Sequence, residues 1–279
     1  MFGNVTRVGS NYHAQEAWNN LKSVNGKIGQ IQSRLSTGKR INSAEDDTSG
    51  YALAKNLEGR TRGLSQALDN VGTAKNVLNI AEGGFQSQMS LLQTMKEKAT
   101  QASDGSWSSD QRQSIHDQFD ALRTEFDEIS ADTLFNSSDT LFSDTAIEFQ
   151  VGAGSTDQLS IVIGTSVAAT VGEGNTNISG LSLVDASDAQ TAISTLDTAI
   201  GSLAKSIQNV GDYNARLSSK EESLSLAISN TDATRSRIED ADFAKEQMDM
   251  MKLSILQQTT IGSFAQANSS GQMVLALFQ

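Results

Sequence analysis

The sequence has no cysteine and no proline among its 279 residues. Without cysteine the chain cannot form disulfide bonds, thiolate metal sites or thiol nucleophiles, because each of these needs a cysteine sulfur. Without proline, no helix is ended or kinked by a ring that removes a backbone donor. Glycine, asparagine and serine therefore have to end the helices.

Aromatic residues make up only 5% of the chain, although 37% of its residues are hydrophobic. Since aromatic side chains dominate the cores of many compact enzymes, this composition favours cores of Leu, Ile, Val and Ala along narrow helical seams. The net charge of −12 argues against a nucleic-acid partner, because the phosphate backbone attracts an excess of Lys and Arg.

Long apolar runs are also missing, since the sequence nowhere has the ~18 consecutive apolar residues of a membrane-spanning helix. The first 15 residues lack the positively charged start and the apolar core of a secretory signal peptide. We therefore expect no membrane partner and no cleaved signal. That leaves the cytoplasm, or export by a route that reads no such signal.

Residues that could support catalysis or bind a metal are sparse. His13 and His116 are the only histidines, and neither has a second histidine at helical metal-site spacing. No Gly-x-Ser-x-Gly sequence occurs, and the glycine-rich spots at 83–84 and 152–154 lack the Gly-Lys-Ser/Thr ending of a phosphate loop. We expect no catalytic residue, no metal site and no cofactor, and hence no enzyme.

Apolar residues at helical spacing fill the two ends of the chain. From Ala14 to Leu35 they recur alternately three and four residues apart, which is a coiled-coil seam pattern. Gly26 and Gly29 lie inside this stretch, and each costs about 1 kcal/mol relative to Ala, so the helix needs a partner. A second amphipathic stretch covers 248–278. The predicted assembly seam consists of Leu21, Val24, Ile28, Ile31, Leu35, Leu253, Leu256, Val274, Leu275 and Leu277.

Three methionines, Met248, Met250 and Met251, lie together at the start of the C-terminal stretch. We interpret them as part of an interface rather than as metal ligands, because methionine side chains fill irregular gaps between helices.

Between the two ends, helical spacing predicts further helices over 57–101, 115–129 and 193–228. The first would be about 65 Å long at 1.5 Å per residue, with Gln88 as a polar interruption of its apolar period. Long helices joined by short turns lie antiparallel to one another.

Apolar and polar residues alternate on either side of a Gly-Ala-Gly-Ser-Thr-Asp turn within 147–163, which indicates a β-hairpin at about 145–165. The residues that follow, 165–184, are expected to form a short turn region, exposed over its Gly-, Thr- and Asn-rich part at 167–180. The predicted fold is mainly α, a long antiparallel helical bundle or coiled coil of N- and C-terminal segments with a small β-hairpin region.

Two charged segments interrupt the helical pattern, each with basic residues followed by acidic ones. The first contains Arg34, Lys39 and Arg40, then Glu45, Asp46 and Asp47, and the second contains Arg235 and Arg237, then Glu239, Asp240 and Asp242. Two interpretations are open: solvated loops, or cations of one segment paired with carboxylates of the other. Exposed pairs contribute only ~0.2–1 kcal/mol each, so such pairing would set the register of the helices rather than their stability.

Two motifs carry a resemblance to a known family. The segment 34–47 (RLSTGKRINSAEDD) with Gly50 resembles the N-terminal signature of bacterial flagellins, and 236–244 (SRIEDADFA) with 255–258 (ILQQ) and 265–268 (AQAN) resembles their C-terminal signature. The resemblance covers roughly 14–130 and 185–279. It implies an inner, channel-lining domain of 1–40 and 240–279 and a middle domain of 41–239. The charged segments would be connectors where neighbouring subunits touch.

By this resemblance, the chain is a structural subunit of the bacterial flagellar filament that self-assembles into a helical tube for motility. It would be extracellular, exported without a cleaved signal peptide. Its partners would be other copies of itself, the flagellar type III export apparatus, a flagellin chaperone, the filament cap and hook-junction proteins. A hook–filament junction protein shares the N-terminal motif, and a non-flagellar helical adaptor would fit the composition. The C-terminal motif favours flagellin.

Some expectations concern the surface of such a filament. The short segment 165–184 stands where larger flagellins carry outer domains, so the filament would be smooth, and Thr165, Ser166 and Thr170 are exposed candidates for glycosylation. The positions that an innate immune receptor reads in many flagellins align with Thr94, Lys98 and Gln118. We therefore do not expect recognition by that receptor. The opening residues and the missing proline near the end also depart from the family pattern.

Overall fold

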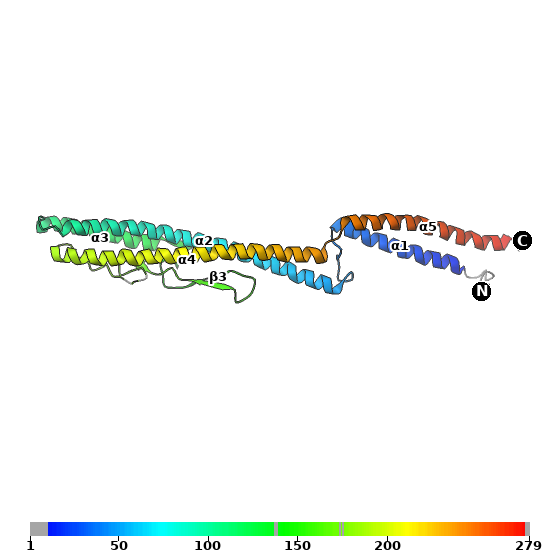
Figure 1. Cartoon of the computed structure of the whole chain (residues 1–279), viewed down its shortest axis with the longest axis horizontal. Helices are drawn as coiled ribbons and strands as arrows, with labels where there is room; N and C mark the ends of the chain where they lie inside the picture. The colour runs from blue at the N-terminus through cyan, green and yellow to red at the C-terminus, as the bar shows by residue number, and fades with distance from the viewer. Residues whose placement is uncertain (1–10, 137–138, 173, 175, 277–279) are drawn as a thin grey trace. The chain divides into compact units, whose positions relative to one another are not determined.

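The computed structural model describes residues 11–136, 139–172, 174 and 176–276. Within these residues the chain forms five helices and three two-stranded antiparallel sheets (Figure 1). The helices are α1 (Tyr12–Thr37), α2 (Thr48–Ala102), α3 (Ser109–Asp132), α4 (Ala186–Glu239) and α5 (Phe243–Ala276). The strands are β1 (Leu134–Asn136), β2 (Asp139–Thr140), β3 (Ile147–Gln150), β4 (Gln158–Ile161), β5 (Ser166–Val167) and β6 (Thr170–Val171). The prediction of a mainly α fold with a small hairpin is confirmed.

The chain divides into two compact units. Residues 1–60 and 230–279 form one, here called the terminal unit, and residues 61–229 form the other, the central unit. The terminal unit holds α1, α5, the first turns of α2 and the last turns of α4.

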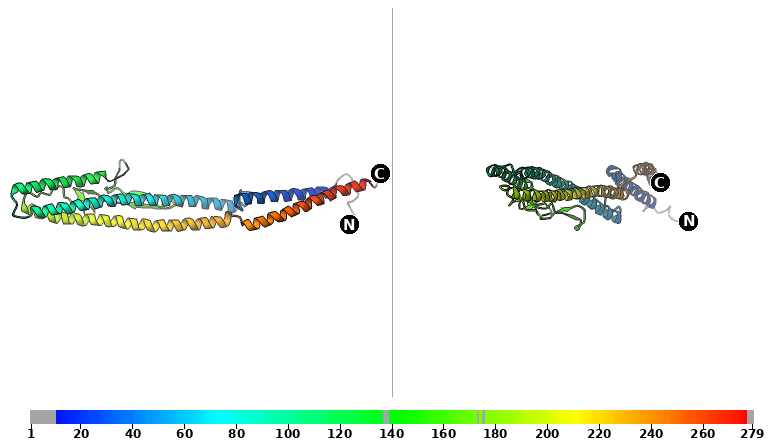
Figure 2. Two further views of the ribbon diagram at one scale, coloured as in Figure 1. Left: turned by 90° about the horizontal axis from the view of Figure 1, so that it is seen from above. Right: turned by 60° about the vertical axis from the view of Figure 1, so that its left-hand side comes forward.

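In the terminal unit, α1 and α5 run antiparallel and side by side (Figures 1 and 2). Three contacts fix their register. Asn11 donates to the carbonyl of Ala267, Gln257 donates to the Asn25 side chain, and the rings of Trp18 and Phe264 lie 5.9 Å apart between centroids. The N-terminal seam therefore pairs with a C-terminal helix, as the sequence pattern requires.

Each end of α1 is capped by a residue suited to that place. Asn11 accepts a hydrogen bond from the backbone N–H of Ala14, which satisfies a donor that has no partner within the helix. Gly38 ends the helix at φ 72°, a left-handed conformation that glycine adopts without steric cost. A helix that contains no proline is thus ended by glycine.

In the central unit, α2 and α4 lie antiparallel, with α3 returning along α2 (Figure 2). Ion pairs from Lys75 to Glu221 and from Lys96 to Asp197 link α2 to α4. The buried apolar residues of this unit form one continuous core from Leu64 to Leu224. Within it, the rings of Phe85 and Phe142 stack at 4.4 Å between centroids.

Gln88, a polar interruption of the α2 pattern, is fully buried and hydrogen-bonded. Its Nε2 donates to the carbonyls of Phe126 and Ser166, at 3.1 and 2.9 Å, and its Oε1 accepts from the Ser166 hydroxyl at 2.7 Å. Because a buried amide without partners would be costly, this network explains how a glutamine can occupy a core position. It joins α2, α3 and β5.

The hairpin predicted around 147–163 is confirmed. Strands β3 and β4 pair antiparallel, with Ile147 opposite Ile161 and Phe149 opposite Leu159. Leu159 and Ile161 are buried, and Asn70 of α2 donates to the carbonyl of Gln150. The hairpin therefore packs onto the helices of the central unit through one of its faces.

The expectation that the turn region 165–184 is exposed over 167–180 was wrong. Ala168, Val171, Ile178 and Leu183 are buried in the core, and the N–H of Ile178 donates to the carbonyl of Ala168 within the segment. Gly172, at φ 60°, lies so close to α4 that a Cβ there would come within 2.5 Å of the Ser202 backbone. The sequence pattern showed the glycines but not the close approach that requires one of them.

The glycosylation candidates change accordingly. Ser166 has no exposed surface and donates its hydroxyl to Gln88, so the expectation that it is exposed was wrong. Thr165 and Thr170 are half-buried.

Candidate assembly site

The two charged segments form connectors between helices. The N-terminal connector, 38–47, joins α1 to α2, and the C-terminal connector, 240–242, joins α4 to α5. The expected second break was placed too early, because Arg235, Arg237 and Glu239 belong to α4. Nothing in that stretch ends a helix, since it holds neither glycine nor proline, and the helix stops only at Asp240.

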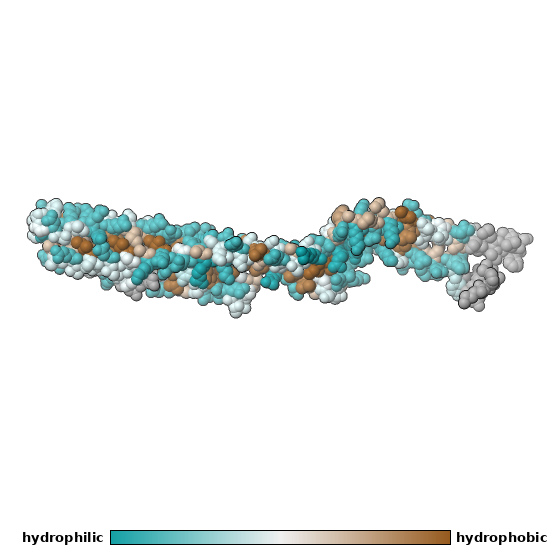
Figure 3. Space-filling view, viewed as in Figure 1, coloured by the Kyte–Doolittle hydropathy of each residue, from teal (hydrophilic) through white to brown (hydrophobic). Residues whose placement is uncertain are grey.

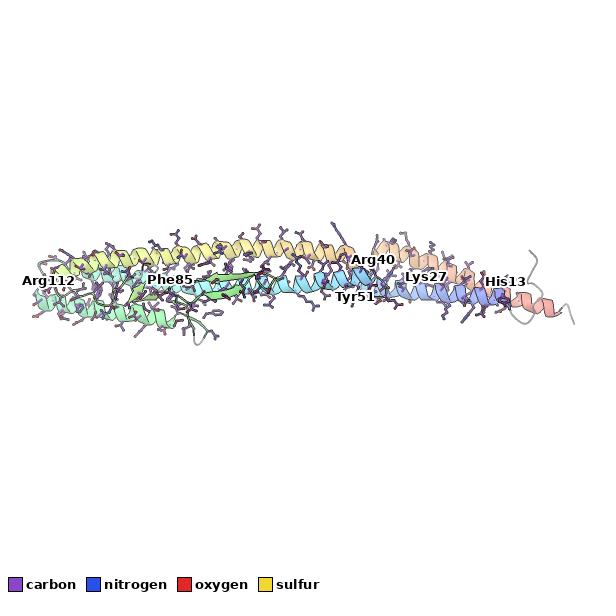
Figure 4. The ribbon with its side chains drawn as sticks, turned by 90° about the horizontal axis from the view of Figure 1, so that it is seen from below. His13, Lys27, Arg40, Tyr51, Phe85 and Arg112 are labelled. Atoms are coloured by element: carbon purple, nitrogen blue, oxygen red, sulfur yellow. The ribbon has the colours of Figure 1, made fainter. Side chains whose placement is uncertain are left out.

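The connectors lie against each other through their backbones. The N–H of Arg40 donates to the carbonyl of Glu239 at 2.7 Å, and the N–H of Ala241 donates to the carbonyl of Gly38 at 2.9 Å. Lys39 and Asp240 form an antiparallel bridge. Figure 4 labels Arg40 at this junction. Residues about 200 positions apart in sequence are therefore held together by a short piece of sheet-like pairing.

One ion pair crosses between the two charged segments. The Nζ of Lys39 lies 2.6 Å from Oε1 of Glu239, whose side chain is only 6% exposed. A second pair joins Arg34 to Glu246 of α5 at 3.4 Å. A carboxylate withdrawn from water is costly unless a cation compensates it, so these pairs fix the register in which the N-terminal connector and α1 meet the end of α4 and the start of α5.

The Arg40 guanidinium binds the end of a helix rather than a carboxylate. Its Nη2 donates to the carbonyl of Ile238 at 2.8 Å, one of the last carbonyls of α4. The C-terminal end of a helix carries partial negative charge and unpaired carbonyls, so a guanidinium there is favourable. Lys39 and Arg40 together therefore secure the end of α4.

The aspartates of the connectors mostly accept hydrogen bonds from backbone N–H groups. Asp46 accepts from the N–H of Asn42 and of Ser43, and from Nε2 of Gln30 on α1. The hydrogen bond from Gln30 lowers the pKa of Asp46, and the bond from Asn42 lowers it further, because both stabilise the charged carboxylate. This side chain folds the connector back on itself and attaches it to α1.

Asp47 and Asp242 cap the helices that follow them. Asp47 accepts from the N–H of Gly50 at the start of α2, and Asp242 accepts from the N–H of Ala244 and Lys245 at the start of α5. A carboxylate at a helix N-terminus satisfies free donors and interacts well with the helix dipole. These two residues therefore start helices and are not partners of the opposite cations.

The remaining charged candidates act locally. Arg235 pairs with Asp232 within α4 at 3.4 Å, Arg237 is exposed, and Asp240 accepts from the hydroxyl of Ser236. Of the two open interpretations, cross-pairing holds for Lys39 with Glu239. Arg40 also reaches the other segment, but through the Ile238 carbonyl, and Arg34 pairs with Glu246 of α5. The other charged residues of the two segments cap helices, bind residues near their own segment or face solvent.

Sequence reasoning missed Glu246, Gln30 and Ile41 as parts of this site. Glu246 could have been found, since an antiparallel pairing that brings Lys39 to Glu239 also brings the α1 turn of Arg34 to that of Glu246. Ile41 is 1% exposed, and a Cβ on Gly50 would come within 2.7 Å of its Cδ1. A side chain at this glycine of the N-terminal motif would therefore force the Ile41 and Asp47 side chains to shift.

The predicted assembly seam is only partly covered. On α1, Ile31 is buried and Leu21, Val24, Ile28 and Leu35 are half-buried; on α5, Leu253 is half-buried and Leu256 is exposed. The side chains of Val274 and Leu275, and all of Leu277, lie outside the described residues. A pairing of two helices leaves each with a side that its partner does not reach.

Several large apolar side chains of α5 remain exposed, among them Met248, Met251 and Ile255. Figure 3 shows apolar surface over the first half of this helix. In a monomeric soluble protein, neighbouring exposed apolar residues mark a surface for association.

The described part of the chain offers neither a metal-binding cluster nor a membrane-spanning helix. That part holds no cluster of three or more His, Cys, Asp or Glu residues that could bind a metal ion. No helix in it is both long enough and apolar enough to cross a membrane.

These features define an α-helical protein with a continuous apolar core in its central unit and a pair of terminal helices that expose apolar side chains. The chain matches the bacterial flagellin N-terminal helical region over residues 8–146 and the bacterial flagellin C-terminal helical region over residues 193–278. It therefore belongs to the bacterial flagellin family.

Curated relatives match along their whole length. The chain is 31% identical to flagellin FlaB1 of Treponema pallidum over 284 residues, with 98% of this chain and 99% of that protein covered. It is also 31% identical to the flagellar filament core protein flaB2 of Brachyspira hyodysenteriae over 288 residues, with the same shares covered. The chain is thus a structural subunit of the flagellar filament and not an enzyme.

A solved structure shares the fold. That of a putative flagellar hook-associated protein from Vibrio parahaemolyticus covers 70% of this chain and 100% of its own, with a TM-score of 0.58 at 16% identity. At this level of sequence identity, the similarity shows the fold alone. The identity of function rests on the flagellin relatives, which do not favour the hook–filament junction alternative.

Proposed function

We propose that the terminal unit is the part of this filament subunit through which copies of the chain join. The observation that carries the proposal is the exposed apolar surface of α5, on a helix whose other side already pairs with α1. Burial of each large side chain contributes on the order of 1.5–3 kcal/mol. In a polymer of identical subunits, a second copy of the chain is the partner that can bury them.

Family membership supports finer assignments within this proposal. Residues 1–40 and 240–279 would line the filament channel, residues 41–239 would form the middle domain, and the connectors around Lys39 and Glu239 would touch neighbouring subunits. The same reasoning proposes an extracellular location, export without a cleaved signal peptide, and contacts with the type III export apparatus, a chaperone, the filament cap and hook-junction proteins. Half-buried Thr165 and Thr170 remain proposed glycosylation positions.

A pair of matched substitutions tests where copies join. Ile255 of α5 is 65% exposed and Leu226 of α4 is 62% exposed, so an aspartate at either position should leave the monomer's fold intact. We expect Ile255→Asp to abolish salt-induced filaments in electron micrographs, because a carboxylate would then be buried between copies. Leu226→Asp, in the central unit, should retain them.

Two results would contradict the proposal. The first is wild-type filament yield from Ile255→Asp. The second is equal loss of filaments in both variants, since association would then not depend on the terminal unit in particular. Circular dichroism on both monomers checks that neither has unfolded.

A further inference from the structure

Helix α5 has two apolar sides. One faces α1: Glu246 pairs with Arg34, Gln257 with Asn25 and Phe264 with Trp18. At about 100° per residue, Met248, Met251 and Ile255 lie roughly 140–200° around the helix axis from Glu246. These three residues, here called the outer stripe, are 59%, 56% and 65% exposed.

Two of the three outer-stripe residues are methionines, and they are more exposed to solvent than the other methionines whose side chains the structure describes. Met95 is fully buried in the core of the central unit, Met89 packs against that core, and Met250 is half-buried on the side of α1. Among the methionines whose side chains the structure describes, Met248 and Met251 are thus the exposed ones. The chain has no cysteine that would react with an oxidant first.

We propose that Met248 and Met251 form an oxidation-sensitive site that blocks assembly once a peroxide has converted them to sulfoxides. A sulfur lone pair attacks one oxygen of hydrogen peroxide, the O–O bond breaks and an S–O bond forms. The departing hydroxide takes the proton of the sulfur-bound OH group and leaves as water, so that a sulfoxide remains. Each thioether loses two electrons, which the peroxide gains.

The consequence for assembly follows from polarity, and it rests on the proposed function of the terminal unit. A thioether gains free energy when it is buried against another apolar surface. A sulfoxide carries a strong acceptor, which must be stripped of water and left without a donor in the same contact. Oxidation of the outer stripe therefore turns an association surface into one that favours solvent.

The sensitive period is that of the unassembled chain. Exposure governs how fast a methionine is oxidised, and a contact with a second copy would remove the outer stripe from solvent. Subunits oxidised before assembly would be excluded, while subunits already in a filament would be protected.

Peroxide titration of the unassembled full-length chain tests the inference. Peptide mass spectrometry would follow each methionine, and we expect Met248 and Met251 to be oxidised at least about tenfold faster than buried Met95. Filament yield on later addition of salt should fall in step with their oxidation. Met248→Leu/Met251→Leu should form filaments whether or not it was treated.

A mimic makes the test independent of oxidant. Met248→Gln/Met251→Gln carries polar side chains of similar length and should lose filaments without treatment. The inference is overturned if treated wild-type chain assembles with both sulfoxides present, if the glutamine variant assembles normally, or if the leucine variant is as sensitive to peroxide as the wild type. Absence of filaments from untreated wild-type chain would instead overturn the proposed function itself.

Discussion

At the scale of single residues, the pair of Lys39 and Glu239 decides how the connectors meet. The carboxylate is nearly buried, whereas the lysine side chain is 39% exposed. The lysine can thus leave for solvent, but the glutamate would stay behind without compensation. The cost of breaking this pair therefore falls mainly on Glu239.

Lys39→Met removes the cation and keeps most of its apolar stem. We expect the terminal unit to lose about 1–3 kcal/mol, between the values for exposed and for buried pairs. Faster hydrogen exchange of the α1 and α5 amides would measure the loss. Arg237→Met removes an exposed cation from the same region and should change little. Equal effects of the two would mean that net charge, and not the pair, matters.

Asp46 gives the N-terminal connector a dependence on pH. Its pKa is lowered in the folded chain by Gln30 and Asn42, so the carboxylate stabilises the fold at pH values above its unfolded pKa. That contribution disappears as pH falls below about 3.8, through the lowered folded pKa.

Asp46→Asn should therefore melt at a lower temperature than the wild type near pH 6. The difference between the two Tm values should shrink as the pH falls below about 3.8. Thermal unfolding followed over a pH series that runs from about 6 to well below 3.8 would measure it. Glu45→Gln, which alters an exposed neighbour, is the control. A difference that stays constant with pH would contradict the assignment.

The charged residues illustrate what spacing can and cannot predict. The mirrored order of basic and acidic residues left solvated loops and cross-pairing both open, and the structure brings the two segments together at Lys39 and Glu239. It did not predict that Asp46, Asp47 and Asp242 would accept from backbone N–H groups. Such groups, in the connector for Asp46 and at helix N-termini for Asp47 and Asp242, compete with a distant cation for the same carboxylate. Local donors two to four residues away cost less chain entropy to reach.

At the scale of elements, the long apolar periods predicted helices well and their ends less well. The helix expected over 57–101 begins at Thr48, since the motif residues 48–56 are helical without a sustained apolar face. The segment 165–184 was misread because its composition resembles that of turns, whereas Ala168, Val171, Ile178 and Leu183 are buried in the core of the central unit. Tertiary packing decided the structure there.

Two glycines of α2 should respond oppositely to the same substitution. A Cβ on Gly50 would meet Asp47 Oδ2 at 2.5 Å and Ile41 Cδ1 at 2.7 Å, whereas Gly59 has no such neighbour within 4 Å. We expect Gly50→Ala to destabilise the terminal unit by about 1–3 kcal/mol, and Gly59→Ala to stabilise it by up to about 1 kcal/mol. Denaturant unfolding measures both, and stabilisation by both would contradict the tight packing at Gly50.

At the scale of the whole molecule, apolar burial is unevenly divided. The continuous core runs from Leu64 to Leu224 and so lies within the central unit. In the described part of the terminal unit, the buried apolar residues are Ile31, Ile41 and Ala54. Most of the apolar burial within one chain is therefore in the central unit, whereas the terminal unit keeps apolar side chains that can pack against other copies. This division suits a subunit that must polymerise.

A fragment of residues 61–229 tests this division. Because the fragment retains the whole continuous core, we expect it to unfold cooperatively, with a Tm within about 5 °C of the main transition of the full chain. It should not form filaments under conditions in which the full chain does, since it lacks both α1 and the outer stripe of α5. Calorimetry and electron microscopy measure the two properties separately. A fragment that is unfolded would mean that the central core depends on the terminal helices, and a fragment that polymerises would move the joining surface to the central unit.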